Sequence, residues 1–439
     1  MEQKNGLNPK EKRTLMIVSL AIVLALVFGI SYAYFLAQDE SGTQTITTQN
    51  IGVELDDGTE KEPVLLATGI KPIDRADIQT KAVKKNFTVT NTGDEKLFVE
   101  ISLDDVVLGT DNALQRYDYL WALYEVNGET EKNISIGSFE TVEDTVTVGK
   151  YLVLEPDAEK EYNLYIWIEE TNINQNAMMG QEFTAKVVAT GEVYWESPAS
   201  DFTFDSATGT ITEYIGTSTE VSIPSVINDV AVTKIGDNDS EGGGDSSFYR
   251  KNLTNVIIPN SVTEIGFEAF SYNSLVNITI PNSVVKINDS AFYANDISTL
   301  IIPDSITTIS DGSFAGNNLT SLTIPNIDNF SGFNENKIIN LVVPNTVTSI
   351  NGFFGNYQLT NLIILDGVEE IKAIAFSDCG ISTVTIPASV TKVGIDAFAS
   401  NPLTEIIIEG KDSLEDFENS TGLTVDGGLP STAKITFNP

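Results

Sequence analysis

The chain has 439 residues, which is too long for one hydrophobic core of ordinary size, so two or more domains are expected. It carries 62 acidic and 25 basic residues, and this formal net charge of −37 argues against binding to nucleic acid. It has no histidine and a single cysteine, Cys379. These absences exclude histidine-dependent triads, histidine-ligated zinc, intrachain disulfides and cysteine-ligated metal clusters. We therefore expect no enzyme, no cofactor and no metal, although chemistry with carboxylates alone stays formally possible.

Residues 1–38 combine a basic tail with an uncharged segment, residues 15–37. At about 1.5 Å per residue this segment would form a helix of roughly 34 Å, enough to cross a hydrocarbon core of about 30 Å. The basic tail should stay in the cytoplasm, so the rest of the chain would be exported. Two outcomes stay open. Small residues at Ser31 and Ala33 permit cleavage after Ala33 and secretion, whereas an uncleaved segment would be a transmembrane anchor.

Residues 39–197 show alternating apolar and polar positions between turn sequences, which is typical of half-buried strands. The enrichment in β-branched and aromatic residues predicts a β-sandwich domain. The clearest expected strands are residues 85–90, 97–103, 163–168 and 183–189.

Three sequence features of this part resemble a known family. The segment Tyr32–Phe35 (YAYF) ends a SipW-type signal, and it is followed by Val89–Gly93 (VTNTG) and Ile166–Glu170 (IWIEE). Together they resemble the TasA/camelysin group of secreted proteins, which implies a jelly-roll fold and a role in extracellular matrix fibres. A metallopeptidase activity attributed to some of that group does not transfer, because the chain lacks the HExxH motif.

The segment 43–55 alternates in the same way and admits two interpretations. It is either the first strand of its own sandwich or a strand that is donated to the edge of a neighbouring subunit.

From residue 253 the sequence repeats with a period of about 22 residues, which predicts a solenoid. Seven copies each hold a short apolar strand that ends at or near a proline and is followed by a phenylalanine. These phenylalanines are Phe270, Phe292, Phe314, Phe333, Phe354, Phe376 and Phe398. We expect their rings to stack in one buried column, while alternate strand residues such as Val256 and Ile258 point inward.

A polar residue follows the phenylalanine by three positions in most copies. Asparagine holds this position at Asn273, Asn295, Asn317, Asn336 and Asn401. These side chains are well placed to bond loop backbone inside each coil. Cys379 occupies the same position, so we interpret it as a structural substitute for asparagine and not as a nucleophile.

This repeat resembles the BspA-type leucine-rich repeats of bacterial surface proteins. On this reading residues 198–252 form an N-terminal cap, residues 253–402 hold the seven repeats, and residues 403–439 form a C-terminal cap. The resemblance implies an adhesion or binding protein that recognises proteins of a host or a neighbouring cell.

The outward positions of the repeated strands form a neutral strip in an otherwise acidic chain, and such a strip is the best candidate for a binding surface. The other interpretation is a solvated face that binds nothing. The candidate residues are Asn255, Ile257, Asn277, Thr279, Thr299, Ile301, Ser321, Thr323, Asn340, Val342, Asn361, Ile363, Thr383 and Thr385.

A weaker motif, Asp237–Asp245, begins like a calcium-binding loop, but Phe248 stands at the twelfth position, where such loops place a bidentate glutamate. The three glycines at 242–244 suggest a flexible insertion in the cap instead.

Taken together, the sequence predicts an exported, all-β bacterial surface or secreted protein that binds another macromolecule, either a protein or a glycan. The alternative is a fibre subunit that self-associates through its sandwich domain. The membrane would be a partner only through an uncleaved N-terminal segment.

Overall fold

The computed structural model of the chain describes residues 53–56, 64–67, 70, 72–73, 77–108, 119–139, 145–169, 183–236, 247–320, 322–324, 327–413, 415–417 and 433–438. The predicted membrane segment and the cleavage site after Ala33 lie outside these residues. Within the described part of the chain, no helix has the length and apolar character needed to span a membrane. The described chain consists mainly of strands, as the all-β prediction requires.

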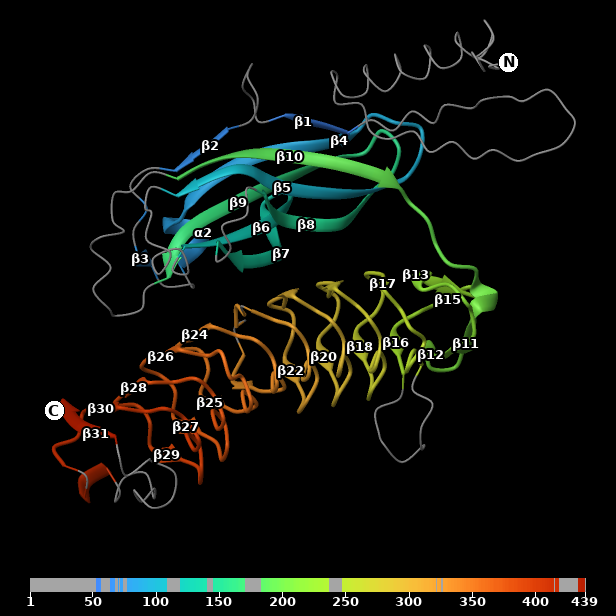
Figure 1. Cartoon of the computed structure of the whole chain (residues 1–439). Coiled ribbons are helices and arrows are strands. Elements are labelled where there is room, and N and C mark those ends of the chain that lie inside the picture. The colour runs from blue at the N-terminus through green and yellow to red at the C-terminus, as the bar shows by residue number, and fades with distance from the viewer. Residues whose placement is uncertain are drawn as a thin grey trace, which may run out of the picture.

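Two regions can be recognised in Figure 1. The first, which we call the two-sheet region, covers residues 53–193 and contains two sheets of long strands. The second, the repeat region, covers residues 202–438 and is a row of coils with short strands. The two regions lie side by side, with strands of both sheets toward the coils that begin the repeat region.

The first sheet of the two-sheet region is mainly antiparallel and is ordered β1-β4-β9-β6-β7, with β3 added beside β9. Its strands are β1 (Val53–Asp56), β3 (Pro72–Ile73), β4 (Val83–Asn91), β6 (Tyr119–Asn127), β7 (Thr130–Ser138) and β9 (Glu159–Glu169). The short helix α2 (Ile78–Lys81) precedes β4. The described part of segment 43–55 therefore pairs within its own chain, as β1 beside β4, and its first ten residues lie outside the described chain.

The second sheet is ordered β2-β10-β5-β8. Its strands are β2 (Val64–Ala67), β5 (Leu97–Leu108), β8 (Thr145–Leu154) and β10 (Phe183–Val193). Apolar side chains from both sheets, among them Phe87, Leu103 and Phe183, form one buried cluster. All four strands that were expected most clearly are present, in β4, β5, β9 and β10.

The repeat region builds two parallel ladders, each interrupted into shorter sheets, because each coil places its strands beside the equivalent strands of the next coil. One ladder begins with an antiparallel pair, β11 (Phe202–Asp205) and β12 (Thr210–Tyr214). It continues through two-residue strands: β16 (Lys234–Ile235), β18 (Glu264–Ile265), β20 (Lys286–Ile287), β22 (Thr308–Ile309), β23 (Asn329–Phe330), β25 (Ser349–Ile350), β27 (Glu370–Ile371) and β29 (Lys392–Val393).

The other ladder carries the apolar repeat strands, most of which end near a proline. They are β13 (Glu220–Ser222), β17 (Asn255–Ile257), β19 (Asn277–Thr279), β21 (Thr299–Ile301), β24 (Asn340–Val343), β26 (Asn361–Ile364), β28 (Thr383–Ile386), β30 (Glu405–Glu409) and β31 (Lys434–Asn438). A hairpin of β14 (Val226–Ile227) and β15 (Val230–Ala231) precedes the repeats. Proline ends these strands because it has no N–H for the ladder, and its carbonyl then accepts from a residue three positions on, as in Val262 N–H to Pro259 O at 3.1 Å.

Phenylalanine rings stack along the interior of the coils, as predicted. Neighbouring centroids lie 5.2 Å apart for Phe270 and Phe292 and 5.1 Å apart for Phe292 and Phe314, with rings within 8° of parallel. The column extends further toward the N-terminus than expected, because Phe248 stacks on Phe270 and Tyr214 stacks on Phe248. Phe248 is therefore a core residue of the cap, and the calcium-loop residues before it lie outside the described chain.

The prediction of one residue in the phenylalanine column is wrong. Phe353, not Phe354, lies in the column, where it is fully buried and stacks on Phe376 at 5.6 Å, while Phe354 is half-buried. The two residues are adjacent in a shortened stretch of the repeat, so spacing alone did not distinguish them. Counted from Phe353, the position three residues on is Asn356. This repeat copy therefore also has an asparagine at that position, which counting from Phe354 had missed.

The asparagine side chains bond each coil to the one before it. Asn317 Nδ2 donates to the carbonyl oxygens of Phe292 at 3.0 Å, of Phe314 at 3.0 Å and of Ala315 at 3.4 Å. Its Oδ1 accepts from the N–H of Ile297 at 3.1 Å. The same pattern recurs at Asn273, Asn295 and Asn336, and Asn356 follows it closely. Each side chain satisfies buried backbone groups that no strand reaches.

Candidate functional site

The parallel register of the second ladder aligns the predicted strip residues in two rows. Asn277 stands opposite Thr299, and Thr279 opposite Ile301. Further along, β24 and β26 align Asn340 with Asn361 and Val342 with Ile363. The next strand, β28, contacts β26, and it aligns Thr383 with Glu405 and Thr385 with Ile407 on β30. Ser321 lies outside the described residues, and Thr323, which is half-buried, belongs to no described strand.

Neighbouring rungs of the strip bond to each other through their side chains. Thr299 Oγ1 donates to Asn277 Oδ1 at 2.8 Å, and Asn361 Nδ2 donates to Asn340 Oδ1 at 2.5 Å. These bonds along the ladder fix the orientation of the polar row while Asn277, Thr299 and Asn361 remain exposed. The second row, with Ile301, Val342 and Ile363, adds half-buried apolar surface beside it.

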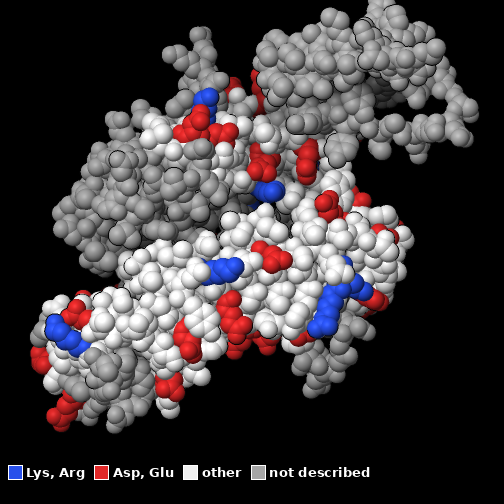
Figure 2. Space-filling view, in the orientation of Figure 1, with Lys and Arg blue, Asp and Glu red and all other residues white. Residues whose placement is uncertain are grey.

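The strip ends at a charged residue, Glu405 on β30. Hydrogen bonds from Lys434 Nζ at 2.9 Å and from Thr436 Oγ1 at 3.0 Å hold the pKa of this carboxyl below its usual value. Both partners lie on β31, which pairs with β30 and covers the outer edge of the ladder. The neutral surface is therefore bounded at this end by an ion pair. Figure 2 shows wide neutral surface across the coils in this view, with acidic groups concentrated along one edge.

The two-sheet region covers the beginning of the strip. Ile257 is only 6% exposed, and Ile301 packs against the core of the two-sheet region. The Tyr151 hydroxyl donates to Asn255 Oδ1 at 3.3 Å, and the Asn282 side-chain amide donates to the carbonyl oxygen of Asn133. The strip thus has two parts. One part contacts β7 and β8 of this chain, and the other has no such contact with the two-sheet residues that the structure describes.

The strip beyond these contacts lies on β24, β26 and β28, and we call it the open strip. Its described residues are Asn340, Val342, Asn361, Ile363, Thr383 and Thr385. Asn361 and Thr383 are exposed, and the other four are half-buried. No charged side chain belongs to these two rows on β24, β26 and β28. The open strip can offer hydroxyl and carboxamide groups beside aliphatic side chains, a mixture that suits a neutral macromolecular surface.

Cys379 lies where the sequence placed it, in the asparagine ladder. Its thiol is buried and contacts the carbonyl oxygens of Phe353 at 3.3 Å and of Ser377 at 3.6 Å. Burial raises the pKa of this thiol to about 12, so it stays protonated and unreactive at neutral pH. Unlike asparagine, it does not accept the N–H of Leu359, which bonds the carbonyl oxygen of Asn356 instead.

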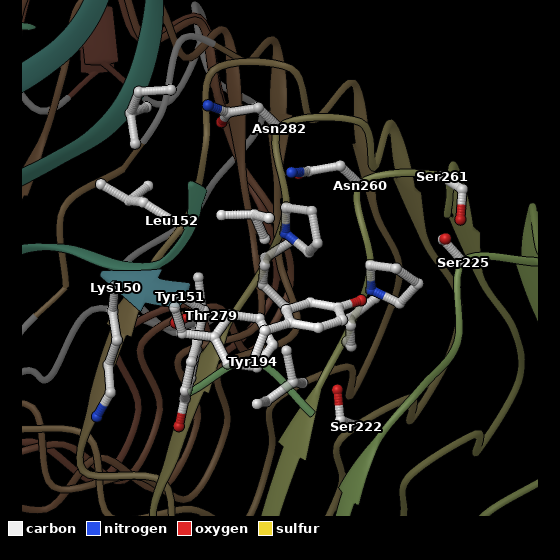
Figure 3. A pocket seen from close by; sticks show the side chains of 18 of the residues that line it. Lys150, Tyr151, Leu152, Tyr194, Ser222, Ser225, Asn260, Ser261, Thr279 and Asn282 are labelled. Carbon is white, nitrogen blue, oxygen red and sulfur yellow. The ribbon is translucent and has the colours of Figure 1, made fainter. Parts of the chain in front are cut away.

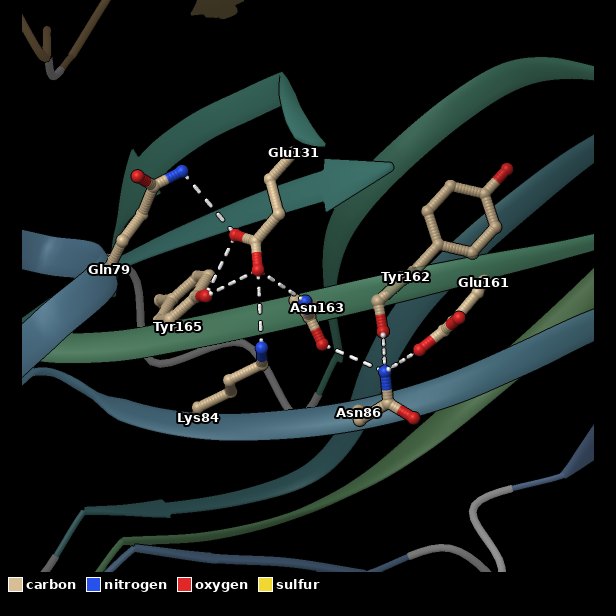
Figure 4. Close-up of polar contacts among 8 residues, drawn as sticks. All are labelled: Gln79, Lys84, Asn86, Glu131, Glu161, Tyr162, Asn163 and Tyr165. Carbon is tan, nitrogen blue, oxygen red and sulfur yellow. Dashed lines mark hydrogen bonds and ion pairs between the residues drawn. The ribbon is translucent and has the colours of Figure 1, made fainter. Parts of the chain in front are cut away.

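A second polar cluster occurs in the two-sheet region, around Glu131 on β7 (Figure 4). Its carboxylate accepts from Tyr165 at 2.8 Å, Asn163 at 2.7 Å, Lys84 at 3.2 Å and Gln79 at 3.4 Å. Burial opposes ionisation of Glu131, but the hydrogen bonds from Tyr165, Lys84 and Asn163 outweigh it and lower the pKa of Glu131. All of these groups are already partnered, so the cluster ties β4, β7 and β9 together and offers no free acid or base.

No group of three or more acidic or cysteine residues that could hold a metal ion occurs in the described parts of the chain. The acidic pair Glu369 and Glu370 does not converge either, because Glu370 is bonded to Lys392 on the next coil while Glu369 is exposed.

Sequence reasoning missed one feature, a cleft between the two regions that lysine and tyrosine side chains line. Lys132, Lys150 and Lys160 come from three different strands of the two-sheet region, and coil residues form the opposite wall. Neither periodicity nor a local motif relates positions that the fold brings together in this way.

Comparison with protein families identifies the repeats. Residues 244–352 and 326–422 match the model of the "BspA type Leucine rich repeat region", in six copies. No curated protein matches the chain. The signal and the TasA-like sandwich remain predictions.

Several solved bacterial structures are similar to part of the chain. A leucine-rich repeat protein from Bacteroides ovatus is 21% identical, with 56% of this chain and 67% of that chain covered and a TM-score of 0.35. A leucine rich cell surface protein from Faecalibacterium prausnitzii is 17% identical, with coverages of 56% and 96% and a TM-score of 0.30. A leucine-rich repeat protein from T. pallidum is 19% identical, with coverages of 49% and 87% and a TM-score of 0.29. The family match identifies residues 244–422 as BspA-type leucine-rich repeats.

Proposed function

We propose that this protein is an exported recognition protein whose leucine-rich repeat solenoid binds an extracellular macromolecule through the open strip. The observation that carries the proposal is the absence of charge from the two aligned rows on β24, β26 and β28, in a chain with a net charge of −37. A neutral row of amide, hydroxyl and aliphatic groups avoids the desolvation of charge that binding would otherwise require.

The match to BspA-type repeats supports a binding role over catalysis, and the chain offers no histidine for acid–base chemistry. Export through the N-terminal segment, and either retention at the membrane or release after Ala33, belong to the same proposal. In it, the two-sheet region is a jelly-roll sandwich that carries the solenoid outside the cell.

The experiment compares two isoleucine-to-lysine variants of the full chain on a panel of extracellular proteins and glycans. Ile363→Lys places a charge in the centre of the open strip. Ile395→Lys makes the same change at a position that is 69% exposed, just after β29 on the other ladder, and serves as the matched control. We expect Ile363→Lys to weaken binding at least tenfold and Ile395→Lys to leave it unchanged.

Equal binding by the two variants would refute the open strip as the contact surface. Ile301 and Thr279 are unsuitable for this test, although they belong to the same rows. Ile301 packs against the two-sheet core and Thr279 lines the cleft, so a lysine at either position would disturb the contact between the regions.

A second candidate function is a fibre subunit that self-associates through the two-sheet region. The observation that favours it is the pair of sheet ends at β1 and β2, each of which has one strand neighbour among the described residues. Unlike a recognition protein, such a subunit would form shear-stable fibres when purified alone. Electron microscopy of the concentrated full chain distinguishes the two, and the absence of fibres would exclude this second function.

A further inference from the structure

A cleft of about 260 Å³ lies between the two-sheet region and the first coils of the repeat region (Figure 3). One wall comes from β5 to β9 and carries Lys150, Tyr151 and Leu152. The other wall comes from the coils around β13, β17 and β19, with Ser222, Asn260 and Thr279 among its residues. Strands from both regions are therefore needed to form it.

The charge of this cleft is opposite to that of the chain. Four lysines line it, Lys96, Lys132, Lys150 and Lys160, against a single carboxylate, Glu125. The chain as a whole has 62 acidic and 25 basic residues. A local excess of positive charge in so acidic a protein attracts an anion to this cleft and away from the remaining surface.

Two of the four lysines lack a carboxylate at hydrogen-bonding distance. Lys160 is paired with Glu125 at 3.1 Å and Lys96 with Glu155 at 2.9 Å. Lys150 forms a looser ion pair with Glu100 at 3.8 Å, and Lys132 is exposed with no ion pair to any residue that the structure describes. Their ammonium groups can therefore bind an incoming anion without first breaking a close pair.

Aromatic rings line the same wall. Phe98 contacts Tyr194 with centroids 4.5 Å apart and Tyr151 with centroids 5.7 Å apart. Lys96 Nζ lies 4.3 Å from the centre of the Tyr194 ring. Aromatic faces pack against the C–H face of a sugar ring. The Tyr151 hydroxyl already donates to Asn255 and the Tyr194 hydroxyl to Glu196, so each phenol oxygen remains available as an acceptor.

The repeat wall supplies neutral hydrogen-bonding side chains. They include Ser222, Ser225, Asn260 and Ser261, and the hydroxyl of Ser261 is buried without a partner in the described structure. Side-chain hydroxyl and carboxamide groups match the many hydroxyl groups of a saccharide. A buried hydroxyl without a partner costs free energy until a ligand or water satisfies it.

We propose that this cleft binds an acidic saccharide, with its carboxylate at Lys132 and Lys150 and a sugar ring against Tyr151 and Tyr194. The volume lies near the lower end of small-molecule sites, about 300 Å³, which corresponds to one or two sugar units. The site is separate from the open strip and does not depend on the function proposed for it.

The test is isothermal titration calorimetry of the full chain with tetragalacturonic acid, with neutral cellotetraose and with tetraglutamate. We expect binding of tetragalacturonic acid, at least tenfold weaker binding of the other two, and weaker binding at higher salt. The double variant Lys132→Gln/Lys150→Gln should weaken binding of tetragalacturonic acid at least tenfold. The control Lys372→Gln/Lys392→Gln removes the same charge from Lys372, which directly follows β27, and from Lys392 on β29, and it should leave binding unchanged.

Several results would overturn the proposal. They are no heat with millimolar tetragalacturonic acid, equal binding of tetraglutamate or cellotetraose, or unchanged binding by Lys132→Gln/Lys150→Gln. Lys132 is exposed and Lys150 is partly exposed, so circular dichroism should show both double variants folded.

Discussion

The repeat region and the two-sheet region both bury aromatic side chains, but they join residues at very different separations along the chain. In the repeat region, stacked rings such as Phe270 and Phe292 are 22 residues apart, and each coil contacts its neighbours. In the two-sheet region, β4 pairs with β9, so Phe87 stands opposite Tyr162. Stability should therefore be modular in the first region and shared across the sheets in the second.

The largest effect expected from this comparison comes from removing one ring in each region. Phe292→Ala deletes a fully buried ring from the column and should lower the free energy of unfolding of its coils by about 3–5 kcal/mol. Phe87→Ala deletes an equally buried ring from the two-sheet core and should cost a similar amount. Hydrogen exchange should accelerate near β19 to β22 in the first variant and across both sheets in the second.

Accelerated exchange throughout the repeat region in Phe292→Ala would contradict the modular account. Phe292→Ala and Phe87→Ala serve as controls for each other. Both replace a buried phenylalanine with alanine, and they differ in whether its contacts are with neighbouring coils or with distant strands.

A smaller loss is expected from the asparagine ladder. Asn317→Ala removes three donated hydrogen bonds and leaves the N–H of Ile297 without its acceptor, so we expect a loss of about 2–3 kcal/mol in denaturant unfolding. Cys379→Ala removes weaker sulfur contacts at the equivalent position and should cost less. Equal losses would mean that volume, and not hydrogen bonding, determines stability at this position.

One coil contains backbone strain that can be relieved. Ile374 has φ of 62°, a conformation that is costly for a β-branched residue, and its side chain is 49% exposed. Gly312 occupies the equivalent position two residues before Phe314. We expect Ile374→Gly to raise the free energy of unfolding by about 0.5–1 kcal/mol, measured by denaturant titration, whereas Ile374→Val should not. A loss of stability in the glycine variant would show that the isoleucine contributes packing that outweighs its strain.

Replacing the single cysteine should raise the free energy of unfolding by a similar or smaller amount. Cys379→Asn restores the side chain that the other coils use at this position, and it can accept the N–H of Leu359. We expect a gain of about 0.5–1 kcal/mol in the free energy of unfolding. A destabilised variant would indicate that the coil has closed around sulfur and no longer accommodates an amide.

The smallest expected effect is on the pH dependence of the free energy of unfolding, and it comes from Glu131 in the two-sheet region. Hydrogen bonds lower the folded-state pKa of Glu131 below its unfolded value, so its contribution to stability is present above about pH 4.3 and is lost as the pH falls through the folded pKa. Glu131→Gln should remove this part of the acid dependence in denaturant unfolding at pH 3 to 6. An unchanged pH profile in the variant would show that the cluster does not stabilise the folded chain.

The same difference between the regions explains which parts of the structure the sequence could predict. Stacking of Phe270, Phe292 and Phe314 and the role of Cys379 followed from period and position, because each coil repeats one environment. The choice of Phe354 over Phe353 failed where the repeat shortens, although Asn356 three positions later was an available signal. The order of the two sheets and the lysines of the cleft depend on long-range pairings, which a single sequence does not specify.

The most direct test of the proposed function is a hydrogen-exchange footprint of the full chain, taken with whichever extracellular protein or glycan it binds. The account predicts that the ligand slows exchange on β24, β26 and β28, along the open strip, and leaves β25, β27 and β29 on the opposite ladder unchanged. Protection of the two-sheet region alone, with the open strip exchanging as in the free chain, would contradict it.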